Sequence, residues 1–134
     1  MKILGIEHIG IAVNDLDTSA PFWSHILNIS HKGKEIVQDQ GVLTDIYDTT
    51  QGKVELLQSL GDATPIGKFL SKRGPGVHHV CFEVDDINQA INELNELNIN
   101  ILSDHPTRGA EGYKVVFIHP ESTGGVLVEL AEKP

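Results

Sequence analysis

The sequence has little of what marks secreted or membrane proteins. Cys81 is its single cysteine, so an internal disulfide and a cysteine-based zinc site are both excluded. No apolar run approaches the roughly 18 residues of a membrane-spanning helix. The first residues also lack the long apolar core of a signal peptide. We therefore expect a cytoplasmic protein with no membrane partner.

Positive charge is scarce as well. Ten Lys and Arg residues stand against 19 Asp and Glu residues, and the formal net charge is −9. Nucleic acid binds basic surfaces, so this balance argues against a nucleic-acid partner. Lys68, Lys72 and Arg73 form a local cluster of cations that could hold a small anionic ligand. Such a cluster is more typical of the solvated C-terminal end of a helix, which is the interpretation we favour.

What the chain does have is an internal repeat. His8 and His79 are 71 positions apart, and the same interval separates Asp15 from Asp86. In both copies the histidine opens a short apolar run, which ends in a polar pair before a helical pattern. A chain of 134 residues has the size of one domain, with room for two small modules that share a core. We therefore expect two modules built on one plan.

The repeat extends to the order of elements, because each half predicts β-α-β-β-β. In the first half we expect strands at 5–13, 35–38, 42–47 and 53–58, and a helix from Asn14 or Asp15 to about residue 28. In the second half we expect strands at 79–84, 99–102, 113–118 and 125–130, and a helix from Asp85 or Asp86 to about residue 97. The prediction is a single domain, 1–134, with module one at 1–60, a linker with a short helix at 61–75 and module two at 76–134.

Period-two alternation assigns the faces of the strands. In the first strand His8 shares a face with Gly10 and Ala12, while the bulkier apolar residues point to the other face. Glu55 and Glu129 occupy matching strands of the two halves, 74 positions apart. If helices cover one face of a curved mixed sheet, the other face forms a cleft on which four side chains converge. These are His8, Glu55, His79 and Glu129.

This set of side chains predicts a metal site. Two imidazoles and two carboxylates suit a divalent first-row metal and leave two octahedral positions for water or a chelating substrate. Open positions are typical of a catalytic site. Two carboxylates buried in one cleft would also be costly without a cation. The mixed nitrogen and oxygen ligands are compatible with Co2+, Mn2+, Ni2+, Zn2+ or Mg2+.

These features resemble the vicinal oxygen chelate superfamily, which includes glyoxalases, bleomycin resistance proteins and dioxygenases. The order His, Glu, His, Glu on paired β-α-β-β-β units covers nearly the whole chain. Within the superfamily, the chain is similar to the epimerases that act on methylmalonyl-CoA. The motifs behind this likeness are Ile6-Glu7-His8-Ile9-Gly10-Ile11-Ala12-Val13, Val54-Glu55-Leu56-Leu57, Gly76-Val77-His78-His79-Val80, Arg108-Gly109-Ala110-Glu111-Gly112, and His119-Pro120 followed by Gly124-Gly125-Val126-Leu127-Val128-Glu129-Leu130.

The resemblance implies an α+β fold and a metal-dependent epimerase with an acyl-CoA thioester substrate. It assigns the metal positions to His8, Glu55, His79 and Glu129, with Co2+ as the expected ion, and it implies a homodimer. Glu129 is the candidate base that removes the α-proton. Some members of the family place a second carboxylate where this chain has Thr44. A threonine is a poor base at neutral pH, so the second base stays open.

Two alternatives fit the same fold. A glyoxalase I would isomerise a glutathione hemithioacetal with the same order of ligands. The Gly-Ala-Glu-Gly loop at 109–112 and the motif at 124–130 favour the epimerase over it. A binding or resistance protein would sequester a ligand in the cleft and would need no metal. The presence of all four predicted ligands argues against that alternative.

Overall fold

The computed structural model describes all 134 residues, which divide into two compact units. The first unit comprises His8–His78, and the second comprises Met1–Glu7 together with His79–Pro134. β1 (Ile3–Val13) therefore begins in the second unit and ends in the first, whereas β5 (Gly76–Val84) begins in the first and ends in the second. No helix has both the length and the apolar character needed to cross a membrane.

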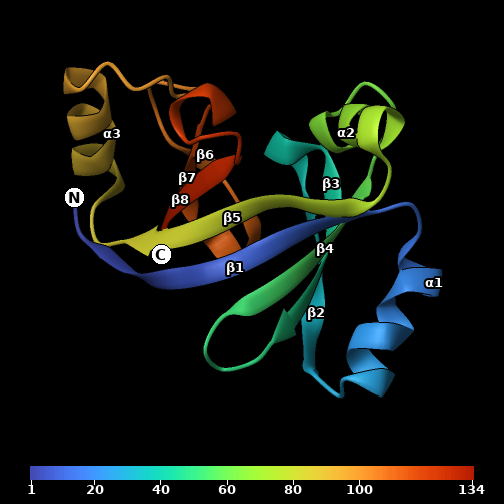
Figure 1. Cartoon of the computed structure of the whole chain (residues 1–134). Coiled ribbons are helices and arrows are strands. Elements are labelled where there is room, and N and C mark those ends of the chain that lie inside the picture. Colours follow the sequence, from blue (N-terminus) through green and yellow to red (C-terminus); the bar gives the residue numbers. More distant parts are fainter. The chain divides into compact units, whose positions relative to one another are not determined.

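The first unit holds two helices and three further strands beside its part of β1 (Figure 1). Its elements are α1 (Leu16–Pro21), β2 (Ser30–Val37), β3 (Val42–Asp48), β4 (Lys53–Ser59) and α2 (Pro65–Arg73). The strands follow the order β2-β3-β4-β1. Pairing is antiparallel from β2 to β4 and parallel between β4 and β1.

α1 begins at the predicted cap. The Asp15 carboxylate accepts a hydrogen bond from the Thr18 N–H at 3.1 Å, which satisfies one of the free donors of the first turn. Pro21 has no N–H to donate, and after it the helix widens into a π-helical turn, Phe22–Ile26. The predicted helix to about residue 28 is therefore a short α-helix followed by a wider turn.

One face of the first unit's strands packs against α1. Leu16 of α1 lies in a cluster of buried residues with Val13, Tyr47 and Leu56. Side chains alternate along a strand, so the residues between them, such as Ala12 and Glu55, point to the opposite face. The predicted division of β1 into an apolar face and a face that carries His8 is confirmed.

The second unit repeats this arrangement around α3. Its elements are the C-terminal part of β5, α3 (Ile87–Glu96), β6 (Thr107–Arg108), β7 (Lys114–Ile118) and β8 (Val128–Glu132). The strand order is β5-β8-β7-β6, with β5 and β8 parallel and the other pairs antiparallel. Asp86 caps α3 by accepting from the Gln89 N–H at 3.0 Å. The mixture of helices with parallel and antiparallel strands in each unit confirms the predicted α+β class.

The start of the chain is held beside α3. The Lys2 N–H donates to the Asp85 carboxylate at 3.3 Å, and the Asp85 N–H donates to the Lys2 carbonyl at 3.4 Å. Figure 1 shows the N-terminus next to α3. The buried stripe of α3 consists of Ile87, Ala90, Ile91 and Leu94, and it packs on Val84, Val116 and Leu130.

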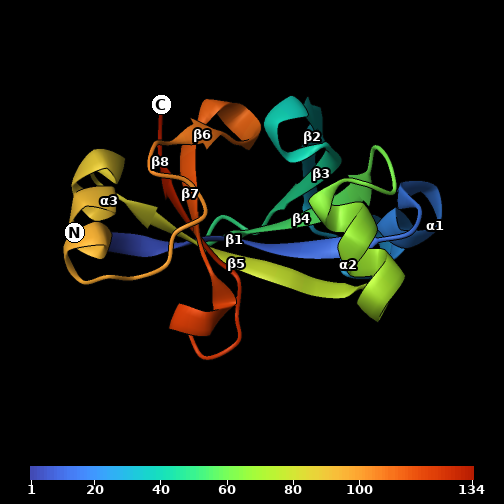
Figure 2. The same ribbon diagram turned by 90° about the horizontal axis from the view of Figure 1, so that it is seen from above.

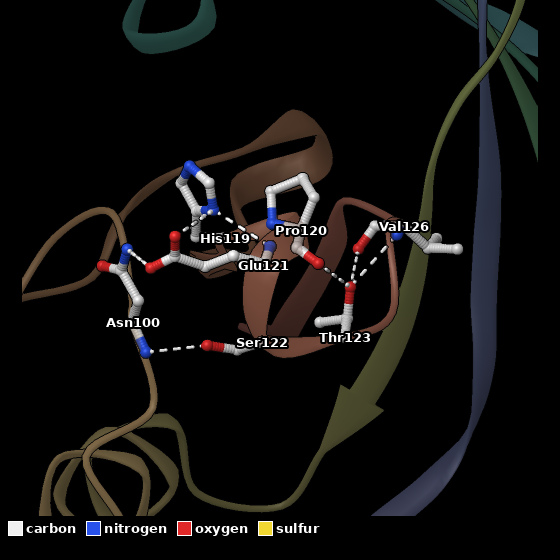
Figure 3. A network of polar contacts seen from close by, with 7 residues as sticks. All are labelled: Asn100, His119, Pro120, Glu121, Ser122, Thr123 and Val126. Atoms are coloured by element: carbon white, nitrogen blue, oxygen red, sulfur yellow. Dashed lines mark hydrogen bonds and ion pairs between the residues drawn. The ribbon is translucent and has the colours of Figure 1, made fainter.

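Two strands of the second half differ from the prediction. The segment 99–102 makes only an isolated bridge, Ile101 to Ile118, and the strand of that position is the two-residue β6. β8 begins at Val128 rather than at residue 125. The residues before it form a loop in which Thr123 Oγ accepts from the Val126 N–H at 3.1 Å (Figure 3). Figure 2 shows this connection projecting beyond β7 and β8.

β3 carries a buried polar network on the face that packs against α1. The Tyr47 hydroxyl donates to Asp45 Oδ2 at 2.7 Å, and His31 Nε2 lies 2.6 Å from Asp45 Oδ1. Asp45 has no exposed surface. Burial, together with the hydrogen bond to Asp45 and the charge of its carboxylate, raises the pKa of Tyr47 from 10.0 to about 12. Both carboxylate oxygens of Asp45 are thus used within the fold.

Replacing Tyr47 with Phe tests this network. Below pH 10 the folded and unfolded states both keep the phenol proton, and between pH 10 and about 12 only the folded state does, so stability falls over that range. Tyr47→Phe should lower the free energy of unfolding by about 1–3 kcal/mol at neutral pH, because Asp45 loses a donor. The variant should also no longer lose stability between pH 10 and about 12. Urea unfolding followed by Trp23 fluorescence at several pH values measures both.

The matched control is Tyr113→Phe at the other tyrosine of the chain. This variant leaves the Asp45 and Tyr47 hydrogen bond intact and should keep the alkaline loss of stability. A Tyr47→Phe protein that loses stability with pH as steeply as the wild type would contradict the assignment.

Candidate metal centre

The first unit places His8 of β1 beside Glu55 of β4. In the parallel ladder Gly10 is the partner of Glu55. His8 is two residues before Gly10, so its side chain lies on the same face as that of Glu55. His8 Nδ1 lies 3.2 Å from Glu55 Oε2. Both residues are buried, with exposed fractions of 6% and 4%. They point away from the α1 face because Leu56, the neighbour of Glu55, packs beneath that helix.

The second unit places His79 of β5 beside Glu129 of β8. His79 Nε2 lies 3.1 Å from Glu129 Oε1, and both residues are buried. The ring of Phe117 on β7 contacts the His79 ring edge to face, with centroids 5.7 Å apart. The buried residues Cys81, Tyr113, Val115 and Ala131 form an apolar cluster with Phe117. The second pair therefore has one wall of apolar side chains.

The two pairs occupy equivalent positions of two equivalent ladders. Gly10 pairs with Glu55 across β1 and β4, and Cys81 pairs with Glu129 across β5 and β8. Gly10 and Cys81 are separated by the same 71 positions as the two histidines, and the two glutamates by 74. The sequence repeat is therefore also a repeat of strand register.

Each pair has the chemistry and spacing of metal ligands. Histidine nitrogen and carboxylate oxygen bind first-row divalent ions at about 2.0–2.2 Å, so two neighbouring ligands of one ion lie about 3 Å apart. The distances of 3.2 Å and 3.1 Å fit this spacing. A cation would also offset the cost of burying the carboxylates of Glu55 and Glu129. The donors present therefore fit a divalent metal.

Two aspartates close to Thr44 in the sequence make contacts of their own. Asp45 faces α1 and bonds to His31 and Tyr47. Asp48 Oδ1 accepts from the Thr50 N–H at 2.7 Å and so caps the turn after β3. Asp45 therefore points away from the face that carries Glu55, and Asp48 lies at the turn that ends β3.

Thr44 and Glu35 share the face of Glu55. Thr44 pairs with Leu57 of β4 on one side and with Glu35 of β2 on the other, and directly paired residues of antiparallel strands point the same way. Thr44 is buried, and Glu35 is half-buried. The sequence did not indicate that Glu35 shares this face. A bulge between His31 and Gly33 shifts the register of β2 on β3, and this shift is not visible in the sequence.

Two further histidines have structural contacts. The ring of His78 contacts the ring of Phe69 on α2 edge to face, with centroids 5.0 Å apart, so it packs on a helix. His119 caps the turn after β7, where its Nδ1 accepts from the Glu121 N–H at 3.0 Å (Figure 3). Asn100 Nδ2 donates to Glu121 at 2.7 Å and completes that network.

The sequence pattern of the Glyoxalase/Bleomycin resistance protein/Dioxygenase superfamily matches residues 7–117. The mitochondrial methylmalonyl-CoA epimerase of Bos taurus is 40% identical over 95% of this chain and 73% of that protein. An ethylmalonyl-CoA/methylmalonyl-CoA epimerase of Cereibacter sphaeroides is 37% identical over 95% of this chain and 96% of that protein.

A solved structure gives the same result for the fold. The methylmalonyl-CoA epimerase of Mycobacterium tuberculosis superposes with a TM-score of 0.94 at 31% identity, over 98% of this chain and 89% of that one. Its likeness and the two β-α-β-β-β units agree with the vicinal oxygen chelate fold. The chain therefore belongs to the glyoxalase, bleomycin resistance protein and dioxygenase superfamily.

Proposed function

We propose that this protein is a metal-dependent epimerase that interconverts (2R)- and (2S)-methylmalonyl-CoA. The observation that carries the proposal is the pair of buried His and Glu side chains at the same register position of each unit. Relatives that carry this activity in their names match nearly the whole chain. The substrate is accordingly an acyl-CoA thioester.

His8, Glu55, His79 and Glu129 together are the proposed ligands of one divalent ion, and Co2+ is the first choice by family resemblance. Zn2+, Mn2+, Ni2+ and Mg2+ suit the same ligands. When bound, the ion supplies positive charge next to the substrate oxygens on which negative charge develops. Because one pair comes from each unit, we propose that both units act as a single domain of residues 1–134.

Glu129 is the proposed base. Its carboxylate removes the proton from C2 of the malonyl group, and the electron pair left at C2 spreads onto the thioester oxygen. Return of a proton to the opposite face of C2 gives the other epimer. His79, 3.1 Å away, orients the carboxylate of Glu129. The apolar cluster around Cys81 keeps bulk water away from that side.

We further propose a homodimer in the cytoplasm. The first half of β1 exposes Ile3, Leu4 and Ile6 at 48%, 50% and 54% of their surfaces, and exposed apolar clusters of this kind mark protein contacts. The assignment of the four metal ligands does not depend on the dimer or on the location.

Glu129→Gln tests the assignment of the base. The amide cannot accept the C2 proton, so the variant should lose entry of solvent deuterium into methylmalonyl-CoA by at least about 100-fold. Circular dichroism, and the urea midpoint measured after treatment with a chelator, should stay close to those of the wild type. Glu132→Gln, on the same strand but engaged with Lys114 at 3.8 Å, is the matched control and should keep full exchange. Retained exchange in Glu129→Gln would exclude Glu129 as the base.

Metal binding is tested by thermal unfolding after treatment with a chelator. Adding Co2+ at 100 times its dissociation constant should stabilise the folded protein by about 2.7 kcal/mol and raise its melting temperature. His79→Gln should lose most of this shift, whereas its neighbour His78→Gln should keep it, because His78 packs on Phe69. Equal shifts in both variants would contradict the ligand assignment.

The glyoxalase alternative is tested with both substrates. The proposal expects deuterium exchange with methylmalonyl-CoA and no lactoylglutathione from a glutathione hemithioacetal. The opposite result would assign the chain to the glyoxalase I reaction.

A further inference from the structure

Thr44 has a buried hydroxyl without a partner in the protein. Its exposed fraction is 1%, and its Oγ makes no hydrogen bond. Elsewhere in the chain threonine hydroxyls are used: those of Thr18, Thr49 and Thr64 donate to the carbonyls of Asp15, Gly52 and Gly61. Thr44 therefore stands apart from the other threonines whose contacts are known.

Folding alone does not explain a threonine at this position. A buried hydroxyl without a partner loses its hydrogen bonds to water and gains none in return, which destabilises the folded state. Valine has nearly the same shape, the same preference for strands and no polar atom. A valine would therefore serve the packing of β3 better. A hydroxyl here makes physical sense if its partner is a ligand.

The position of Thr44 points to the proposed substrate. Thr44 pairs with Leu57, two residues along β4 from Glu55, so Thr44 and Glu55 are diagonal neighbours on one face. In the parallel ladder Leu57 pairs with Ala12 and Glu55 with Gly10, so the neighbours on β1 are two small residues. The hydroxyl and the proposed metal ligand thus belong to the same buried surface.

The charges on this face favour a donor at Thr44. Glu55 is acidic, and Glu35 lies across the β2 ladder from Thr44 without accepting its hydroxyl. A malonyl thioester carries a carboxylate and a thioester oxygen, both of which accept hydrogen bonds. A neutral hydroxyl at position 44 can donate a hydrogen bond to these oxygens, whereas an ionised carboxylate can only accept one.

We infer that Thr44 is a substrate-binding residue whose hydroxyl donates a hydrogen bond to an oxygen of the bound malonyl thioester. This assignment rests on the proposed function. Relatives that resemble this chain can have a base at the position of Thr44. Here the residue would have a different role, because a threonine hydroxyl can hold the substrate but does not remove its C2 proton.

Three variants test the inference. Thr44→Val removes the hydroxyl, Thr44→Ser keeps it, and Thr64→Val is the control because Thr64 caps α2 in the same unit and bonds to Gly61 and Gly67. Calorimetry with malonyl-CoA gives the dissociation constant, urea unfolding gives stability, and methylmalonyl-CoA gives the rate of epimerisation. All three proteins are measured with the metal bound.

The expected pattern separates binding from stability. Thr44→Val should bind malonyl-CoA about 10-fold more weakly, which corresponds to about 1.4 kcal/mol, and should be as stable as the wild type or more stable. Thr44→Ser should bind within about 3-fold of the wild type, because the donor remains. Thr64→Val should lose stability and bind malonyl-CoA normally.

Two results would overturn the inference. Wild-type affinity in Thr44→Val would show that the hydroxyl does not touch the substrate. A loss of stability in Thr44→Val as large as that in Thr64→Val would show that the hydroxyl has a partner in the fold. Failure of the proposed function looks different, because the wild type itself would then neither bind malonyl-CoA nor epimerise methylmalonyl-CoA.

Discussion

The parallel pairing of two strands within each unit is the interaction on which the rest of the structure depends. It sets Gly10 opposite Glu55 in one ladder and Cys81 opposite Glu129 in the other. A slip of one residue would turn a glutamate toward the helix and bury its charge among apolar side chains. Leu56 and Leu130 oppose such a slip, because each neighbours a glutamate and packs on the helix side. The apolar cores therefore hold the polar pairs in register.

Two neighbouring residues of β3, Thr44 and Asp45, face opposite sides of the sheet and have different roles. Asp45 faces the helix side, where His31 and Tyr47 bond to both oxygens of its carboxylate. Thr44 faces the other side, and its hydroxyl makes no hydrogen bond within the protein. The first arrangement stabilises the fold, since a buried carboxylate without donors would be costly. The second costs stability, and such a cost is expected where a residue serves a ligand.

Much of the fold and of the proposed site could be predicted from the sequence, because the signals were local. Alternation of apolar residues assigned the face of His8, and the caps at Asp15 and Asp86 marked two helix starts. The start of β8 could not be predicted, because a side-chain contact of Thr123 decides where the loop ends. The face of Glu35 depends on a bulge in β2, and bulges follow from pairing between distant segments rather than from local sequence.

The chain crosses between its two units at β1, and this has a consequence for the order of folding. Residues 8–78 are synthesised before most of the second unit, so they can begin to pack during synthesis. Residues 1–7 belong with the segment that starts at His79, and Lys2 bonds to Asp85, 83 positions later. Residues 1–7 are thus made before residues 8–78 but find their partners only once the segment from His79 onward has been made. This contact closes a loop of more than 80 residues, which costs chain entropy that the contacts of the second unit must offset.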